Sequence, residues 1–324
     1  MTPPVTLSLE ALLRRGAHAL VIGVGGGGDV VGALATARFL EFCGLHFTLG
    51  GLPWERFVHD PLPGPRGLLE VRNIRALHPY AWAVNGTTHS HTGVRFTETE
   101  MAALYGREVL HIDINGGAIG AIAGLEASIS ALDIDLLVGI DVGGDSLAHG
   151  DEVGLRSPLA DAVMLAAFVE LERKGVPVIW GVFGYGSDGE LTTGEIERAL
   201  ARVAQAGGFL GASALTPQIV RELEDVIVKV PTEASAIPLR CAKGAWGKTK
   251  IRYDERTVKL TPLSTLTFYL TPSAVFESVA RPARAVASSS SLEEANTALN
   301  ALGIKTELDL ERERARKTIQ ENKC

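Results

Sequence analysis

The sequence predicts an α/β protein with a three-layer, Rossmann-like architecture: a mostly parallel sheet with helices on both faces, followed by a C-terminal α+β extension. Two observations favour this class. Short apolar, β-branched segments alternate with longer helical segments, and such alternation is typical of parallel strands joined by right-handed crossovers. Several strand segments also end in a glycine loop from which the next helix starts, as at 18–43 and again at 108–132.

Apolar runs and helix end signals predict the regular elements in chain order. Strands are expected at 18–24, 46–51, 108–114, 133–142 and 176–184. Helices are expected at 30–44, from about residue 98, and at 118–132, 157–175 and 192–208. Thr97 and Glu100 form a capping-box pattern at the start of the second helix. Ser157 as N-cap, Pro158 at the first position and Gly175 as the stop bound the fourth.

The remaining segments are less regular. For residues 53–95 the sequence predicts a segment rich in turns, which contains a short strand before a long polar loop. Residues 209–285, which hold a helical segment and a threonine-rich strand, are expected to be a substructure or an edge ribbon of a 1–285 domain. Residues 286–324 predict a serine linker, a capped helix and a charged surface helix at the end of the chain.

The composition bounds the class of protein. The chain has 324 residues, of which 46% are hydrophobic and 21% charged, and this is enough for a sizeable core. Its net charge of −7 argues against a nucleic-acid partner. Three cysteines without a CxxC pair indicate a reducing cytoplasm, and there is neither a secretory pattern nor an apolar run of about 18 residues for a membrane. We therefore expect a cytoplasmic protein, and its size class favours a homo-oligomer.

Four predicted loops combine glycine with an acid or an amide. They are Gly23–Asp29, Asp113–Gly117, Asp141–Asp145 and Gly184–Glu190. Each follows a predicted strand, and the loops after the carboxyl ends of parallel strands share one edge of the sheet. Ligands of such proteins bind at this edge, near the point where the strand order reverses. We therefore expect the four loops to open onto one rim, which is the predicted ligand site.

The first loop fits the G-x-G-x-x-G pattern through Gly23, Gly25 and Gly28, after a strand and before a helix. Its amides and the helix N-terminus predict an anion site. The residues predicted to bind that anion are Gly25, Gly26, Gly27 and Gly28. The acid that ends the second strand of NAD-binding proteins is missing, so this fingerprint is incomplete. Asp29 either caps its helix and faces away from the ligand, or faces a metal ion or a hydroxyl group.

The third loop carries the densest group of acids. Asp141, Asp145, Asp151 and Glu152 fall within twelve residues, with His149 among them. Their oxygens suit Mg²⁺ or Mn²⁺, and also the hydroxyls of a ribose or a substrate amine. His149 is the predicted general acid or base, so the catalytic candidates are His149, Asp145 and Asp141. The predicted metal ligands are Asp141, Asp145 and Asp29. A solvated acidic loop is the alternative.

Other residues complete the predicted site or stay open. Further contacts to a nucleotide cofactor are predicted for Asp29, Asn115, Gly116, Gly117, Gly143, Gly144 and Ser187. His89 and His91 either share a metal ion or lie in a plain surface loop. Asp161 falls in the first turn of a helix, where the helix dipole explains an acid without a function. The absence of a G-x-S-x-G elbow disfavours a serine hydrolase.

Five stretches of the chain resemble a known microbial family. They are GVGGGGDVVGA at 23–33, GLPWER at 51–56, PGPRG at 63–67, DVGGDSLAHGDEVGLRSPLADAVML at 141–165 and GVFGYGSDGEL at 181–191. Together they resemble DUF1152, a family of unknown function, over about the first 280 residues. The resemblance implies no reaction, and it therefore supplies no catalytic residues.

Three functional hypotheses follow from these patterns. The first is an enzyme that binds a phosphorylated or nucleotide-type small molecule at the glycine and aspartate loops, assisted by Mg²⁺. The second is a metal-independent hydrolase or lyase that acts on a cationic or polyhydroxy metabolite. The third is a nucleotide sensor or assembly subunit without catalysis.

Overall fold

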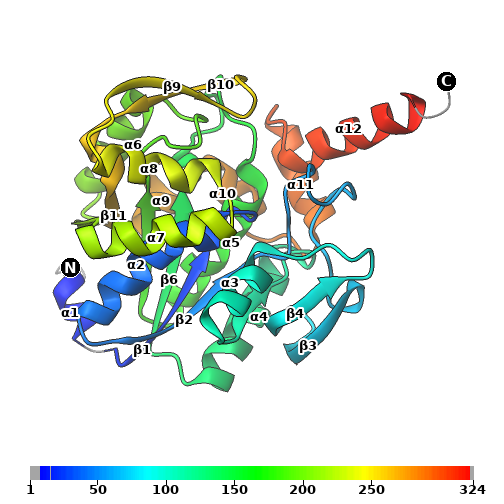
Figure 1. Ribbon diagram of the computed structural model, residues 1–324, viewed down its shortest axis with the longest axis horizontal. Coiled ribbons are helices and arrows are strands. Elements are labelled where there is room, and N and C mark those ends of the chain that lie inside the picture. The colour runs from blue at the N-terminus through cyan, green and yellow to red at the C-terminus, as the bar shows by residue number, and fades with distance from the viewer. Residues whose placement is uncertain (1–7, 15, 322–324) are drawn as a thin grey trace.

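The computed structural model describes residues 8–14 and 16–321, and within them a nine-stranded mixed sheet forms the centre of the molecule (Figure 1). The strand order is β3-β4-β5-β2-β1-β6-β7-β11-β8. Residues 1–7, where the sequence shows no secretory pattern, and 322–324, the end of the expected tail, lie outside the described residues.

The five central strands are parallel, as the sequence predicts. They are β1 (His18–Gly23), β2 (His46–Gly51), β5 (Val109–Ile112), β6 (Leu136–Val142) and β7 (Val178–Phe183). Their order, β5-β2-β1-β6-β7, runs outward in both directions from β1 and β6. The strand order therefore reverses between β1 and β6, and this is the switch point at which α/β proteins of this class bind ligands.

Antiparallel strands extend the sheet on both sides. On one side lie β4 (Ala81–Ser90) and β3 (Val71–His78), and on the other β11 (Leu266–Leu270) and β8 (Phe209–Ala214). The prediction of one short strand and a long polar loop within 53–95 is therefore wrong. The outer strand β3 is largely exposed, and the polar residues of such an edge strand hide it from a search for apolar runs.

Residues 209–285 contribute to two separate sheets. β8 and β11 join the main sheet, whereas β9 (Gly247–Ile251) and β10 (Arg256–Leu260) pair only with each other as an antiparallel hairpin. The hairpin packs its inner face on a small core of its own, made by Ile237, Cys241, Ile251, Val258 and Leu260. Figure 1 shows the hairpin at the top of the molecule, beyond the ends of the central strands.

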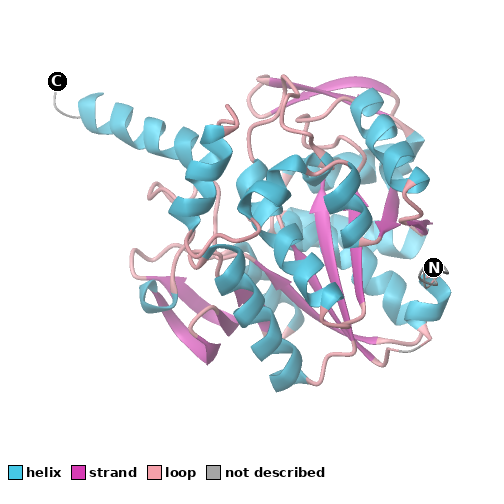
Figure 2. Ribbon diagram, turned by 180° about the vertical axis from the view of Figure 1, so that it is seen from behind, coloured by secondary structure: helices cyan, strands magenta, loops and turns pink. Residues whose placement is uncertain are grey.

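Two hydrophobic cores lie on the two faces of the sheet, so the layers are helix, sheet and helix (Figure 2). β1 shows why, because Leu20 and Ile22 enter one core while Ala19 and Val21 enter the other. One core includes side chains from α1 (Leu9–Leu13), α2 (Asp29–Phe42), α3 (Thr97–Tyr105), α7 (Pro217–Lys229) and α8 (Glu233–Ala242). The other includes side chains from α4 (Gly117–Leu132), α5 (Pro158–Arg173), α6 (Thr193–Gln205), α9 (Pro272–Ser278), α10 (Arg281–Val286), α11 (Leu292–Ala301) and α12 (Glu307–Glu321).

Two helix starts differ from the expectation in their capping. Phe96, not Thr97, precedes the first turn of α3, and Glu100 pairs with Arg95 instead of closing a capping box. Ser157 does precede α5, but its hydroxyl donates to Glu190 and makes no capping bond. At α5 a tertiary contact replaces the local one, whereas at α3 the preceding residue Arg95 takes the glutamate. Among the helices described, none is long and apolar enough to span a membrane.

Candidate functional site

A cavity of about 500 Å³ lies at the carboxyl ends of β1, β2, β6 and β7, and we call it the switch-point cavity. Three of the four predicted loops reach it, through Gly25–Asp29, through Asp145, and through Asp188 and Glu190. The shared rim expected from the sequence is therefore present, but only in part. The loop that follows β2 takes the place of the fourth, and it contributes the wall from Trp54 to His59.

The Asp113–Gly117 loop, which is the remaining one of the four, packs against other parts of the chain and contributes no residue to the cavity lining. Asn115 donates to the carboxylate of Asp113 (2.8 Å), and Gly116 and Gly117 leave space for Tyr80 and for Ser289. A side-chain carbon at Gly116 would lie 2.6 Å from the Tyr80 ring, and one at Gly117 would lie 2.6 Å from the Ser289 carbonyl. These glycines therefore serve close packing, and the predicted cofactor contacts of Asn115, Gly116 and Gly117 gain no support.

Asp29 braces the glycine loop from within. It occupies the first turn of α2, and its carboxylate turns back to accept from the amides of Gly25 (3.0 Å) and Val142 (3.3 Å). The amide of Gly27 donates to the Trp54 carbonyl (2.8 Å). Among the described residues, only Gly26 and Gly28 of the four predicted anion-binding glycines keep amides without an acceptor. Two of the four amides predicted to bind an anion are therefore available to a ligand.

Five buried carboxylates gather beneath this loop, and we call them the acid cluster: Asp141, Asp145, Asp161, Asp188 and Glu190. Each is at most 7% exposed. Asp141 ends β6, Asp145 begins the short 3-10 helix Asp145–Leu147, and Asp161 lies in the first turn of α5. The other two come from the loop between β7 and α6. The ends of β6 and β7 and the start of α5 therefore place these acids together.

The carboxylate oxygens are close enough to share a cation. Those of Asp141, Asp145 and Asp161 lie within 4.8 Å of one another, and so do those of Asp145, Asp188 and Glu190. Asp145 belongs to both sets and is therefore the centre of the cluster. Asp29, the third predicted metal ligand, is absent from both sets, although it lies close enough to raise the pKa of Asp161.

Some of these carboxylates already have partners inside the protein. Asp141 accepts from the amides of Gly144 (3.0 Å) and Ser146 (2.9 Å). Glu190 accepts from the amide of Ser157 (2.9 Å) and pairs with Arg256 (2.9 Å). Asp141 and Glu190 are consequently held in place, and Glu190 is also neutralised.

Other polar atoms are buried with nothing to bind. Among the described residues, Asp161 Oδ1, Asp188 Oδ1 and the hydroxyl of Ser187 have no hydrogen-bond partner, although these side chains are 2%, 5% and 0% exposed. A buried carboxylate without a partner is costly, so such a group either keeps a proton or binds a cation. Asp161 and Asp188 line the switch-point cavity, and their oxygens without a partner are the strongest indication of a cation site.

Burial and mutual repulsion make ionisation of the cluster unfavourable. Burial, followed by the charge of Asp161, raises the pKa of Asp145 well above its usual range. Burial and then Asp141 do the same for Asp161, and burial and then Glu190 do the same for Asp188. Without a cation, these carboxyl groups therefore retain protons at pH values where an exposed aspartate has none.

Gly143 and Gly144 shape the cluster from the third predicted loop. A side-chain carbon at Gly143 would lie 2.3 Å from the Asp188 carboxylate, and its φ of +130° also requires glycine. Gly144 donates its amide to Asp141. These two residues, predicted to contact a cofactor, instead make room for one acid and hold another.

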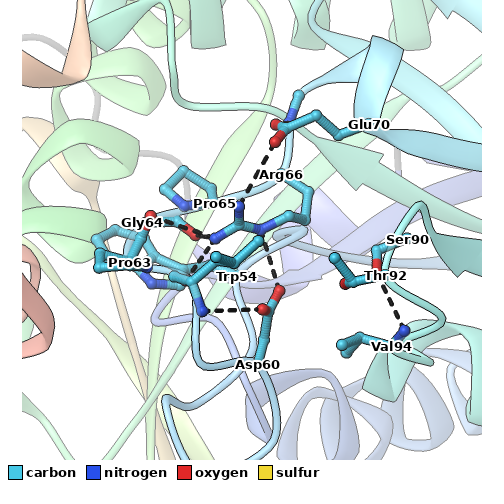
Figure 3. Close-up of polar contacts among 12 residues, drawn as sticks. Trp54, Asp60, Pro63, Gly64, Pro65, Arg66, Glu70, Ser90, Thr92 and Val94 are labelled. Carbon is cyan, nitrogen blue, oxygen red and sulfur yellow. Dashed lines mark hydrogen bonds and ion pairs between the residues drawn. The ribbon is translucent and has the colours of Figure 1, made fainter. Parts of the chain in front are cut away.

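Another part of the cavity wall, Trp54 to His59, belongs to the 53–67 loop, whose conformation a buried arginine holds (Figure 3). Arg66 Nε lies 3.0 Å from Asp60 Oδ2, and both side chains are at most 7% exposed. Its Nη2 donates to the carbonyls of Leu62, Pro63 and Gly64. One guanidinium group thus donates hydrogen bonds to three carbonyl groups of a proline-rich turn that has no regular structure. These bonds hold the conformation of the 53–67 loop.

The C-terminal helix α12 closes the cavity from a third side. Glu307 accepts from the amides of Leu159 (3.0 Å) and Ala160 (2.8 Å) at the start of α5, and Glu311 accepts from Trp54 Nε1 (3.1 Å). Both acids line the cavity. The first half of the expected surface helix is therefore bonded to the rest of the protein. Figure 1 shows the far end of α12 extending away from the body of the molecule.

The predicted histidines lie elsewhere. Among the described residues that line the cavity His149 does not appear; its side chain is 45% exposed and its Nδ1 lies 3.2 Å from Asp151. The predicted proton-transfer role of His149 thus remains a prediction without geometric support. His89 bonds the Thr87 carbonyl, and neither His89 nor His91 belongs to a possible metal group within the described chain.

A second buried pair lies behind the 53–67 loop. Trp82 Nε1 donates to His111 Nδ1 (3.1 Å), so the other ring nitrogen carries the proton and donates to Glu98 (3.2 Å). Burial lowers the pKa of His111 to about 3 and raises that of Glu98 to about 8. Gly51, at the end of β2, makes room, because a side-chain carbon there would lie 1.9 Å from Glu98 Oε1.

Replacing Glu98 with glutamine is expected to reduce the pH dependence of stability. The pKa of Glu98 is about 8 in the folded protein against an ordinary 4.5, so unfolding between these pH values releases a proton. Stability therefore falls as pH rises, by up to about 1.4 kcal/mol per pH unit for one proton. Urea denaturation from pH 5 to pH 8 should show a shallower fall for E98Q. An unchanged slope would contradict this, and the partly exposed Glu100→Gln serves as control.

The fold and the site together define a class: a Rossmann-like α/β protein whose switch-point cavity contains a buried acid cluster. The chain belongs to a family described as "Protein of unknown function (DUF1152)", whose model matches residues 20–315. The resemblance seen in the sequence motifs is thus confirmed. No curated protein and no solved structure matches the chain.

Sequence reasoning missed four acids of this site. In the sequence, the helix dipole accounts for Asp161, and Asp188 and Glu190 are only part of a predicted glycine loop. Three acid-bearing loops on one rim are the signal that could have identified these residues. Glu307 gave no usable signal, because nothing in a charged C-terminal helix marks the residue that caps a helix far away in the sequence.

Proposed function

We propose that the protein is a divalent-metal-dependent enzyme that acts on a phosphorylated or nucleotide-type small molecule in the switch-point cavity. Asp145 and Asp161 would bind the cation, with Asp141 held behind them by backbone amides. The observation that carries the proposal is Asp161, a carboxylate only 2% exposed whose Oδ1 has no partner among the described residues. A cation at this position removes the cost of burying the charge.

The donor atoms favour Mg²⁺ or Mn²⁺ over other metals. All candidate ligands are carboxylate oxygens, and neither histidine nor cysteine is part of the two possible metal groups in the described chain. Hard oxygen ligands suit Mg²⁺ and Mn²⁺, which also bind the oxygens of phosphate groups. The cation would then offset the repulsion between the acid cluster and an anionic substrate.

A phosphate-bearing ligand accounts for the other wall of the cavity. The free amides of Gly26 and Gly28 lie at the N-terminus of α2, where a partial positive charge favours anions. Arg56, Arg252 and Arg256 also line the cavity. A purely cationic or polyhydroxy metabolite would explain the acids but not these arginines, so the phosphate hypothesis accounts for more of the lining.

Asp188 is the proposed proton acceptor for an attacking water molecule. Its Oδ1 has no partner among the described residues, and it offers a carboxylate oxygen within 4.8 Å of one on Asp145. Its raised pKa brings the group closer to the range in which general bases are efficient. In this proposal Asp188 takes the role that the sequence suggested for His149. A cytoplasmic location and homo-oligomerisation remain predictions.

Phosphate release from nucleotides and sugar phosphates tests the proposed activity. We expect turnover that requires Mg²⁺ or Mn²⁺ and falls at least about 100-fold in Asp161→Asn, which removes one metal ligand. Asp151→Asn, at an exposed position of the loop between β6 and α5, should retain activity. Metal-dependent nucleotide binding without any turnover would instead favour a sensor. Tight binding of an amine or a sugar without metal would favour the metal-independent alternative.

A further inference from the structure

The mouth of the switch-point cavity carries three arginines from two distant segments. Arg56 belongs to the 53–67 loop, while Arg252 and Arg256 flank the tip of the β9–β10 hairpin. Arg56 and Arg252 both lie near the carboxylate of Glu233, and Arg256 lines the same cavity. Such a concentration of positive charge is unexpected in a protein whose net charge is −7.

Among the described residues, Arg56 and Arg252 have no close counterion, whereas Arg256 pairs with Glu190. Glu233 is shared between Arg56 (3.7 Å) and Arg252 (3.9 Å), and both distances are long for an ion pair. Arg252 Nε is buried and has no hydrogen-bond partner among the described residues. Burial and then the charge of Arg252 lower the pKa of Arg56. An anion bound between these side chains would relieve the repulsion and supply the missing acceptor.

The arginine group adjoins the acid cluster. Arg256 Nη1 lies 2.9 Å from Glu190 Oε1 and donates to the carbonyl of Asp188 (3.0 Å). A ligand bound to a metal ion at the acid cluster would therefore extend directly to the arginines. The hairpin holds its own two residues through the small core formed by α8, β9 and β10, which fixes the strand on each side of the tip.

The hairpin tip is strained in a way that favours a binding role. Arg252, Tyr253 and Asp254 all have left-handed backbone conformations, with φ of 56°, 56° and 69°. Residues other than glycine rarely adopt this backbone conformation, and backbone strain of this kind is common at ligand-binding sites. The consequence at Arg252 is that its amide turns toward Glu233 (3.2 Å) while its side chain stays at the cavity.

We propose that Arg56, Arg252 and Arg256 form a second anion subsite, which binds a phosphoryl group that does not contact the metal. The ligand of the cavity then carries two linked phosphoryl groups, one at the acid cluster and one at the arginines, as in a diphosphate. This inference rests on the proposed function for the first phosphoryl group. Inorganic pyrophosphate is the simplest ligand that spans both subsites, and inorganic phosphate fills only one.

Calorimetric titration with these two probes tests the subsite. Equimolar Mn²⁺–pyrophosphate and Mn²⁺–phosphate are titrated into the wild type, Arg56→Gln and Arg252→Gln. We expect each variant to bind pyrophosphate about tenfold more weakly, because each loses charge-assisted hydrogen bonds. Phosphate binding should change less than about threefold. Lys250→Gln removes a charge from the outer face of the same hairpin and should leave both affinities unchanged.

Several results would overturn the inference. Unchanged pyrophosphate binding in both arginine variants would remove the subsite, and equal weakening of phosphate and pyrophosphate would reduce the two subsites to one. An equal effect of Lys250→Gln would show a general charge effect. Two further arms separate this inference from the metal proposal: Mn²⁺ alone, and pyrophosphate without metal. If Mn²⁺ fails to bind while pyrophosphate still depends on Arg252, the metal proposal fails and the arginine subsite stands.

Discussion

Replacing Asp145 with asparagine is expected to abolish divalent-metal binding and, at the same time, to stabilise the metal-free protein. Asp145 belongs to both possible ligand sets, so its loss removes an oxygen ligand from each. It is also the carboxylate whose pKa is raised by burial and by four neighbouring acids. Asparagine has nearly the same shape and no charge, and we therefore expect a gain of about 1–2 kcal/mol without metal.

Thermal denaturation with EDTA and with Mg²⁺ measures both effects of Asp145→Asn. The wild type should gain stability from Mg²⁺, by about 2.7 kcal/mol at a hundred times the dissociation constant, and the variant should gain nothing. The stabilisation of the metal-free variant should grow from pH 5 to pH 8, because unfolding of the wild type releases the proton that buried Asp145 retains, whereas asparagine has no such proton to release. Asp151→Asn, with a side chain 80% exposed before substitution, is the control. A destabilised variant that still responds to Mg²⁺ would contradict the assignment.

Replacing Arg66 with methionine is expected to cost about 3–5 kcal/mol of stability, because it leaves the buried charge of Asp60 without its counterion. The carbonyls of Leu62, Pro63 and Gly64 lose their donor in the same step. The 53–67 loop contains no helix or strand, so it has no regular backbone hydrogen bonds that could replace the lost ones. The bond from the amide of Gly64 to α12 remains. Ligand binding should weaken as well, since the loop carries Arg56 and one wall of the cavity.

Urea denaturation of Arg66→Met and of Arg75→Met provides a matched comparison. Arg75 also pairs with a carboxylate, Glu108, but both side chains are about half exposed, and such a pair is worth at most about 1 kcal/mol. Only the buried arginine should therefore produce a large loss. Equal and small losses in the two variants would show that the 53–67 loop does not depend on Arg66.

The parallel core could be predicted because its strands are buried on both faces. Segments such as 18–24 and 136–142 are nearly continuous apolar runs, and glycines mark their ends. The rim followed from the same rule, because every parallel strand ends at one edge. The loop after β5 breaks this expectation, since Tyr80 and Ser289 fill the space next to its glycines. Sequence patterns do not reveal such long-range packing.

The role of Asp29 illustrates how far a local motif can be interpreted. The sequence alone, a glycine run followed by an acid, indicates a phosphate-binding loop whose aspartate would repel the phosphate. In the structure the acid faces inward, accepts two backbone amides and joins the electrostatic surroundings of Asp161. One of these amides belongs to Val142 of β6, which is far from Asp29 in the sequence, so this bond depends on the tertiary fold. The same holds for Arg252 and Arg256, which reach the cavity from a hairpin far along the chain.

Anomalous diffraction from crystals soaked in Mn²⁺ tests the central claim most directly. We expect a Mn²⁺ peak at the acid cluster, about 2.0–2.4 Å from carboxylate oxygens of Asp145 and Asp161. Crystals of Asp145→Asn treated in the same way should lack it. No peak at saturating Mn²⁺, or peaks only at exposed acids such as Asp151, would contradict a metal centre at the switch point.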